Sequence, residues 1–140
     1  MKTILTPLIL LLGSLVGSAQ LNVHLAIERN QYLAHEPVHA VVTITNRSGK
    51  ALELFSEKKG LIAHSWLNFS MRTGGGRPLP KLPNSVFQKA VLPAGQAIKR
   101  RVNLNQICGI SRVNAYSVSA SIRQPGIDTM TYSSNSAHFN

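Results

Sequence analysis

The stretch Ala-Tyr-Ser-Val-Ser-Ala-Ser-Ile-Arg at residues 115–123 alternates apolar and polar side chains from Tyr116 onward. Successive side chains of a β-strand point to opposite faces of the sheet, so this pattern predicts a strand with one buried face and a row of serines facing solvent. The apolar residues of an amphipathic helix would instead recur every three or four positions. The stretch therefore favours an all-β protein.

The same alternation recurs along most of the chain, interrupted by short clusters rich in Gly, Pro, Asn and Ser. It predicts strands at residues 21–28, 38–45, 52–54, 66–72, 86–92, 97–104, 115–123 and 130–139. Seven to eight short strands in a domain of this size are typical of an antiparallel β-sandwich. Helical periodicity is almost absent, and the one short helical turn that we expect lies around residues 106–111.

Residues 1–19 have the features of a signal peptide. Lys2 supplies the positive charge, residues 4–16 form an uncharged, leucine-rich segment, and residues 17–19 are small. The apolar segment is short for a membrane span, although a retained single-helix anchor is the alternative. We therefore predict a secreted or periplasmic domain at residues 20–140, with no transmembrane span after the signal is removed.

Composition restricts the class of protein further. Of the 140 residues, 44% are hydrophobic and 14% are charged, which suits one folded domain and not a disordered tail. The single cysteine, Cys108, excludes a disulfide within the chain and a cysteine-rich zinc site. Because Cys108 has apolar neighbours, we expect a buried thiol, with pairing to another molecule as the alternative.

The residues needed for catalysis are scarce. Acidic residues number 5 and are scattered singly, and Asp128 is the one aspartate. The sequence has no Gly-x-Ser-x-Gly motif, and its 5 histidines show no metal-ligand spacing. We therefore predict that the protein is not an enzyme and that it has no catalytic residue, metal or cofactor.

Several short phrases resemble the immunoglobulin-like sandwich of the BsuPI-type intracellular proteinase inhibitor family and related exported bacterial domains. They are Tyr32 with Glu36-Pro37-Val38, Ile44-Thr45-Asn46-Arg47-Ser48, Leu92-Pro93-Ala94-Gly95-Gln96, Arg101-Val102-Asn103-Leu104 and Ala115-Tyr116-Ser117-Val118-Ser119-Ala120. The resemblance implies an immunoglobulin-like fold, but its phrases mark strands and turns and carry no active-site residue. The family's inhibitory loop has no residue-by-residue match, so the resemblance does not by itself imply inhibition.

Two segments are candidates for contact with a partner. The first is the loop at residues 73–85, which is expected to cross between two sheets and to have a flexible tip of three glycines next to Arg77. The second is a basic strand, on which Lys99 and Arg101 share one face and Arg100 the other. Cations on an exposed edge strand also prevent aggregation, which is the alternative role of this strand. The candidate partner-binding residues are Gly74, Gly75, Gly76, Arg77, Lys99, Arg100 and Arg101.

The formal net charge of +10 favours anionic partners. Nucleic acid is disfavoured, because export separates the protein from it and no basic motif with interleaved aromatics is present. The leading hypothesis is an exported, non-enzymatic module that binds another protein through loops of the sandwich. A protease inhibitor presenting an extended loop is the second hypothesis, and a charge-driven binder of an anionic envelope surface is the third.

Overall fold

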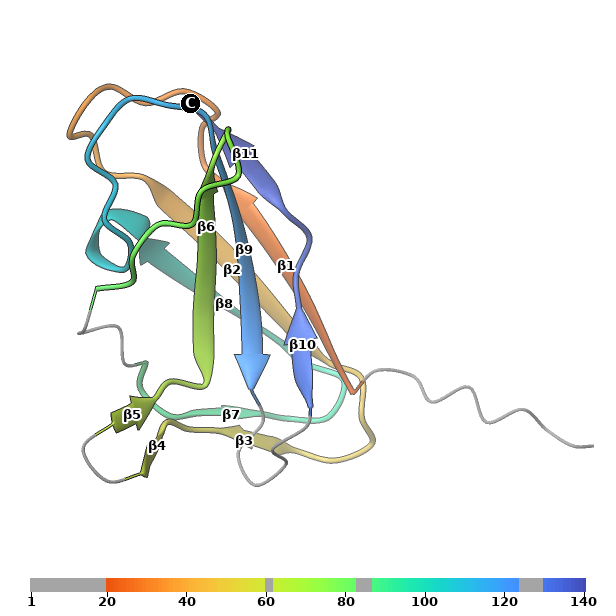
Figure 1. Cartoon of the computed structure of the whole chain (residues 1–140). Coiled ribbons are helices and arrows are strands. Elements are labelled where there is room, and N and C mark those ends of the chain that lie inside the picture. The colour runs from red at the N-terminus through yellow and green to blue at the C-terminus, as the bar shows by residue number, and fades with distance from the viewer. Residues whose placement is uncertain (1–19, 60–61, 83–86, 124–129) are drawn as a thin grey trace, which may run out of the picture.

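The computed structural model describes residues 20–59, 62–82, 87–123 and 130–140, so the expected signal peptide lies outside the described residues. The chain traces a sandwich of antiparallel strands (Figure 1). The described strands are β1 (Leu21–Ile27), β2 (His39–Asn46), β3 (Leu52–Leu54), β4 (Glu57–Lys59), β5 (Ile62–His64), β6 (Leu67–Thr73), β7 (Ala90–Leu92), β8 (Ala97–Asn103), β9 (Tyr116–Arg123), β10 (Thr131–Ser133) and β11 (Ala137–Phe139). Within these residues no helix is long and apolar enough to cross a membrane.

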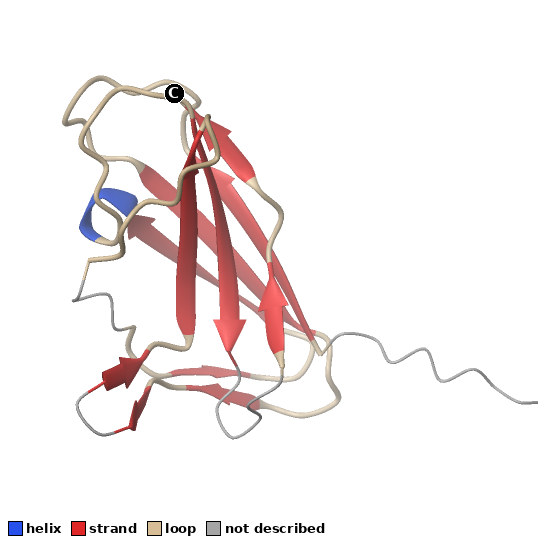
Figure 2. Ribbon diagram, viewed as in Figure 1, coloured by secondary structure: helices blue, strands red, loops and turns tan. Residues whose placement is uncertain are grey.

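Two larger antiparallel sheets make up the sandwich, and the two-stranded pairs β3-β7 and β4-β5 lie at one end of it, as Figure 2 shows. One sheet has the order β1-β2-β8, and in the other β9 pairs with β6 on one side and with β10 and β11 on the other. This division matches the A-B-E and C-F-G strands of immunoglobulin-type sandwiches. The all-β sandwich predicted from the sequence is confirmed. The described strands outnumber the seven to eight expected, because the last strand is broken in two and β4 pairs with β5 in a hairpin that the sequence pattern did not reveal.

The core lies between the sheets and is built by the alternation seen in the sequence. On β9 the four apolar side chains beginning at Tyr116 are buried, whereas the serines between them face outward. Trp66 and Phe69 are the largest fully buried side chains. The Trp66 indole donates a 3.0 Å hydrogen bond from Nε1 to the carbonyl of Gln88, which satisfies its buried polar atom. The short helical turn expected around residues 106–111 lies slightly earlier in the chain, as a single 3-10 turn at Leu104–Gln106.

Asn135, between β10 and β11, connects the two sheets. Its side chain accepts a 2.9 Å hydrogen bond at Oδ1 from the Leu25 N–H and donates a 2.9 Å bond from Nδ2 to the Leu25 carbonyl. The side-chain amide thus takes the place of a neighbouring strand beside β1. This contact explains why the stretch at residues 130–139, which we predicted as one strand, is interrupted at its centre.

Asn46 organises one end of the sandwich and is completely buried. Its Oδ1 accepts hydrogen bonds from the backbone N–H and the hydroxyl of Ser48, at 2.8 and 2.7 Å. Its Nδ2 donates to the carbonyls of Lys50, Leu92 and Pro93. The side-chain amide of Asn46 therefore connects the turn at Ser48 to the end of β7 and to the residue that follows it.

Candidate functional site

The opposite end of the sandwich is formed by the β1–β2 loop (residues 28–38), the segment at 107–115 that precedes β9, and Asn140. Beneath these segments three aromatic rings pack together. The Phe139 ring lies edge-on to Tyr32, with centroids 5.8 Å apart, and stacks on Tyr116 at 5.4 Å. The backbone N–H of Tyr32 donates a 2.8 Å hydrogen bond to the Asn140 carbonyl. This end, which we call the loop end, is therefore anchored to the core.

Glu36 shapes the β1–β2 loop. Its Oε2 accepts a 2.9 Å hydrogen bond from the Leu33 N–H, and its Oε1 accepts one from the Arg29 guanidinium. The bond from Leu33 and then the one from Arg29 lower the pKa of the Glu36 carboxyl below its ordinary value. Arg29 also lies 4.8 Å above the Tyr32 ring. These contacts hold a loop in which His35 adopts a φ of 65°, a conformation that is uncommon outside glycine.

The segment at residues 107–115 is held by a different contact. The Tyr116 hydroxyl donates a 2.6 Å hydrogen bond to the carbonyl of Arg112, which lies four residues earlier. Immunoglobulin-type domains carry a tyrosine with the same kind of bond at this corner. This hydrogen bond fixes the backbone next to Val113, whose side chain is exposed.

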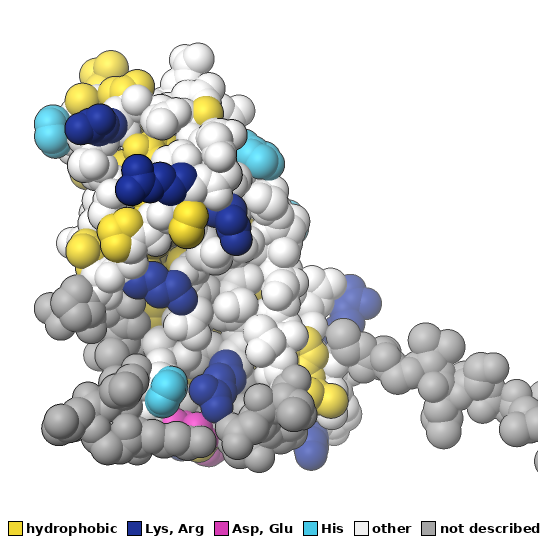
Figure 3. All heavy atoms as spheres, viewed as in Figure 1, with side chains coloured by type: hydrophobic (Ala, Val, Ile, Leu, Met, Phe, Trp, Pro, Cys, Tyr) yellow, Lys and Arg dark blue, Asp and Glu magenta, His cyan; other side chains and the backbone are white. Residues whose placement is uncertain are grey.

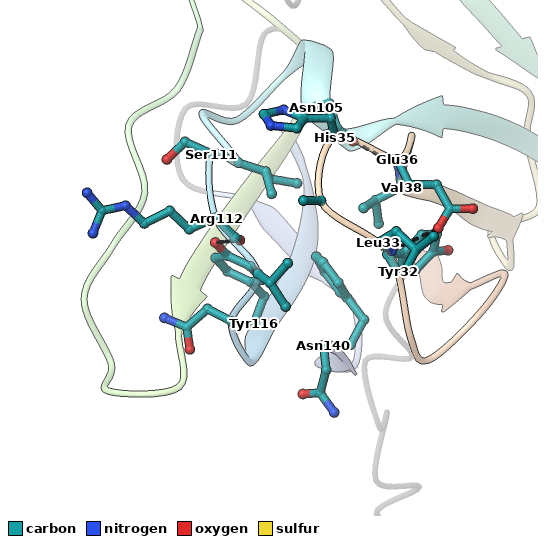
Figure 4. Close-up of a pocket in the computed structure, with 15 residues that line it drawn as sticks. Tyr32, Leu33, His35, Glu36, Val38, Asn105, Ser111, Arg112, Tyr116 and Asn140 are labelled. Atoms are coloured by element: carbon teal, nitrogen blue, oxygen red, sulfur yellow. Dashed lines mark hydrogen bonds between the residues drawn. The ribbon is translucent and has the colours of Figure 1, made fainter.

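A shallow apolar cleft separates these two segments. Leu33 and Val113 line it from opposite sides, and they are 80% and 64% exposed. The cleft has a volume of about 390 Å³, and the buried Tyr32 is another of its lining residues. Figure 4 shows Leu33, Tyr32 and Glu36 on one segment of the chain, and Arg112 and Tyr116 on the other side of the pocket that these residues line. Large exposed apolar side chains gathered in one cleft mark a contact surface more often than scattered ones do.

A second hollow, more polar than the first, adjoins the loop end. It lies between the loop at residues 73–82 and the segment at 109–116, has a volume of about 510 Å³, and is lined by both Arg77 and Arg112. In Figure 4 the Arg112 side chain points away from Leu33 and Glu36. Within the described part of the chain, neither guanidinium forms an ion pair with a carboxylate.

The glycine-rich tip predicted as flexible is a tight turn closed by hydrogen bonds. Gly76 donates a 2.8 Å bond from its N–H to the Thr73 carbonyl, and Gly74 donates one of 2.6 Å to Ala115. A Cβ at Gly74 would lie 3.1 Å from the Ala115 Cβ, so a side chain there would force Ala115 to shift, and Gly76 has a φ of +80°, which strains any other residue. Gly75 completes the turn. Arg77, which follows the turn, lines the polar hollow together with Arg112.

The described part of the loop at residues 73–85 is bonded to the rest of the domain. Residues 77–79 fold back along β6, with the Leu79 N–H donating a 2.9 Å hydrogen bond to the Met71 carbonyl. Lys81 then pairs with Cys108 in a β-bridge, and the Leu82 N–H bonds to the Ile107 carbonyl. The loop connects two sheets as expected, since β6 and β7 belong to different ones, and it is in addition attached to its neighbours at several points. Residues 83–85 of that prediction lie outside the described residues.

The basic strand is β8, which forms an edge of its sheet. Arg101 pairs with Glu28 through bonds of 2.5 and 3.0 Å, so its charge is already matched. In the β2–β8 register Arg100 pairs with Val42, which is fully buried, so the Arg100 side chain lies on the inner face of the sheet. Lys99 is exposed, and the two neighbours therefore point to opposite faces, as the alternation predicted. The structure places the two candidate segments in different sheets, so they do not form one surface.

Among the described residues, Cys108 is not a reactive thiol, and the acidic residues are not grouped with other potential metal ligands. Burial raises the pKa of the Cys108 thiol, which keeps it protonated and unreactive, and its predicted burial is confirmed. In the part of the chain that the structure describes, no three His, Cys, Asp or Glu side chains are grouped to hold a metal ion.

No protein-family model matches the chain, and no curated protein matches it in sequence. Of the residues that line the cleft and the hollow, Arg77 was named as a candidate from the sequence, and Leu33 and Val113 were not. In the sequence, Leu33 and Val113 are each an apolar residue within a cluster of polar turn residues. This pattern points to a shared surface only when the fold shows that the two turns lie side by side.

Proposed function

We propose that this chain is an exported, non-enzymatic binding module that recognises another protein through the loop end of its sandwich. The observation that carries the proposal is the cleft between Leu33 and Val113, two exposed apolar side chains from segments far apart in sequence. A soluble domain gains nothing from keeping such a cleft open, whereas burying one leucine against a partner contributes about 1.5–3 kcal/mol to binding.

The rigidity of the loop end supports a recognition role. Glu36 fixes one wall of the cleft through Leu33 and Arg29, and Tyr116 fixes the other through Arg112. Preorganised walls lose little conformational entropy when a partner binds, so a small contact area can still give useful affinity.

The protease-inhibitor hypothesis receives less support from the geometry. An inhibitor of that kind presents an extended segment that is free to enter a protease cleft. The described residues of the loop at 73–82 are instead bonded to β6 and to the segment around Ile107. The loop end consequently remains the better candidate for contact with a partner.

Site-specific photo-crosslinking in the cells that make the protein tests the proposal. A photoreactive amino acid at position 33 or 113 is expected to trap one discrete protein partner. The matched control is position 91, because Val91 is also apolar and 54% exposed but lies in β7 at the opposite end (Figure 1). Equal trapping from all three positions, or none from 33 and 113, would overturn the proposal.

A further inference from the structure

We infer that the segment recognised at the loop end is an acidic peptide, whose apolar side chain enters the cleft and whose carboxylate meets Arg112, with Arg77 beyond it. The inference rests on the proposed function and adds the chemistry of the partner. It depends on the position of Arg112, which directly precedes Val113 in the chain. Val113 lines the apolar cleft, whereas Arg112 lines the polar hollow next to it.

The cationic half of this surface draws on two separate segments. Arg77 follows the turn after β6, and Arg112 belongs to the segment before β9. Around them the hollow offers further hydrogen-bond donors, namely the hydroxyls of Thr73 and Ser111 and the side-chain amide of Asn114. Guanidinium groups bind carboxylates through paired N–H···O bonds, so this lining suits a carboxylate better than any neutral group.

The charges elsewhere in the described structure leave these two arginines available. Glu28 pairs with Arg101, Glu36 with Arg29, and Glu53 with Lys89. Glu57 also has an interaction partner. In Figure 3 the face that carries β6 displays several Lys and Arg side chains, and acidic groups are visible on it near the β4–β5 end, far from the loop end. An approaching acidic segment would therefore meet uncompensated positive charge.

The shape of the site favours a peptide over a lipid surface. The two apolar side chains line a concave cleft, and Glu36 is one of its lining residues. A side chain projecting from a peptide can enter such a cleft, whereas the flat surface of a membrane would not fill it. Binding to vesicles is accordingly one of the outcomes that the experiment distinguishes.

A display library of short random peptides, panned against the full-length protein, provides the test. We expect the enriched peptides to carry Asp or Glu within a few residues of Leu, Ile or Val. The double variant Arg77→Ser with Arg112→Ser is expected to bind these peptides about tenfold more weakly, the loss of roughly one charge-assisted hydrogen bond. Arg47→Ser, which removes an exposed cation in the turn after β2, is the control and should bind as the unmodified protein does.

The other outcomes distinguish a failure of the acidic preference from a failure of the proposed function. Neutral or basic peptides that lose binding in Leu33→Ser would overturn the acidic preference and leave the proposed function standing. Peptides unaffected by Leu33→Ser, or no enrichment at all, would contradict both. Sedimentation of the protein with vesicles of phosphatidylglycerol and phosphatidylcholine, abolished by Leu33→Ser, would replace the peptide with a lipid surface.

Discussion

The Tyr116 hydroxyl donates a 2.6 Å hydrogen bond to the backbone carbonyl of Arg112, and this bond links the folded core to the candidate site. The Tyr116 ring is buried and stacks on Phe139, whereas Arg112 is exposed at the loop end. Arg112 and its neighbour Val113 are thereby held in position by a residue of β9. Stability of the fold and geometry of the site are coupled at this corner.

Tyr116→Phe should keep the ring in the core and remove the bond. Since one net hydrogen bond contributes about 0.5–1.5 kcal/mol, the free energy of unfolding is expected to fall by about that amount. Urea unfolding measures the change. Tyr132→Phe is the control, because the Tyr132 hydroxyl contacts only the Met130 sulfur among the described residues and its removal should cost less than about 0.5 kcal/mol. Equal losses in the two variants would contradict the structural role of Tyr116.

Asn46→Ala is expected to be the most destabilising polar substitution that we consider. It leaves the Lys50, Leu92 and Pro93 carbonyls without the amide that now binds them. Loss of buried hydrogen bonds of this kind costs about 2–4 kcal/mol in total. Thermal unfolding would reveal the effect, with the exposed Asn22→Ala on β1 as the matched control. A shift no larger than that of the control would show that the Asn46 contacts contribute little.

Arg100→Val is expected to promote self-association. Arg100 lies on the inner face of the edge strand β8, and an inward-pointing charge there discourages another chain from pairing with the edge. Light scattering at increasing protein concentration should detect larger species for this variant. Arg47→Val removes the same charge from an exposed turn and should scatter light as the unmodified protein does if the edge position is what matters.

The β1–β2 loop is expected to loosen in acid. Because hydrogen bonds from Leu33 and Arg29 lower the pKa of folded Glu36, the ionised carboxylate stabilises the loop above the ordinary value of 4.5. This stabilisation is lost as the pH falls through the lower folded pKa. The Leu33 amide proton, followed by NMR from neutral to acidic pH, should titrate below that value and should not titrate in Glu36→Gln. A midpoint at or above 4.5 would contradict the contact.

Local patterns in the sequence were sufficient to predict most of the sheet. Alternation located β1, β6, β8 and β9 to within about two residues, the uncertainty usual for element ends. Asn46 closes a local turn by accepting a hydrogen bond from the N–H of Ser48, only two residues on. These features depend on neighbours in the chain, so the sequence displays them directly.

Features that depend on distant residues were beyond the same reasoning. Glu28 and Arg101 are 73 positions apart, so their ion pair becomes visible only in the fold. The interruption of the last strand arises because Asn135 bonds to Leu25 on β1. The cleft between Leu33 and Val113 likewise exists only after the β1–β2 loop and the segment before β9 are brought together.

The central claim is that the loop end binds the partner, and calorimetric titration of the partner trapped by crosslinking tests it most directly. Leu33→Ser should weaken the affinity by about tenfold or more, because at least one apolar side chain would no longer be buried in the complex. Val91→Ser, at the opposite end of the sandwich, should bind as the unmodified protein does. An unchanged affinity for Leu33→Ser, or an equal loss in Val91→Ser, would contradict the account.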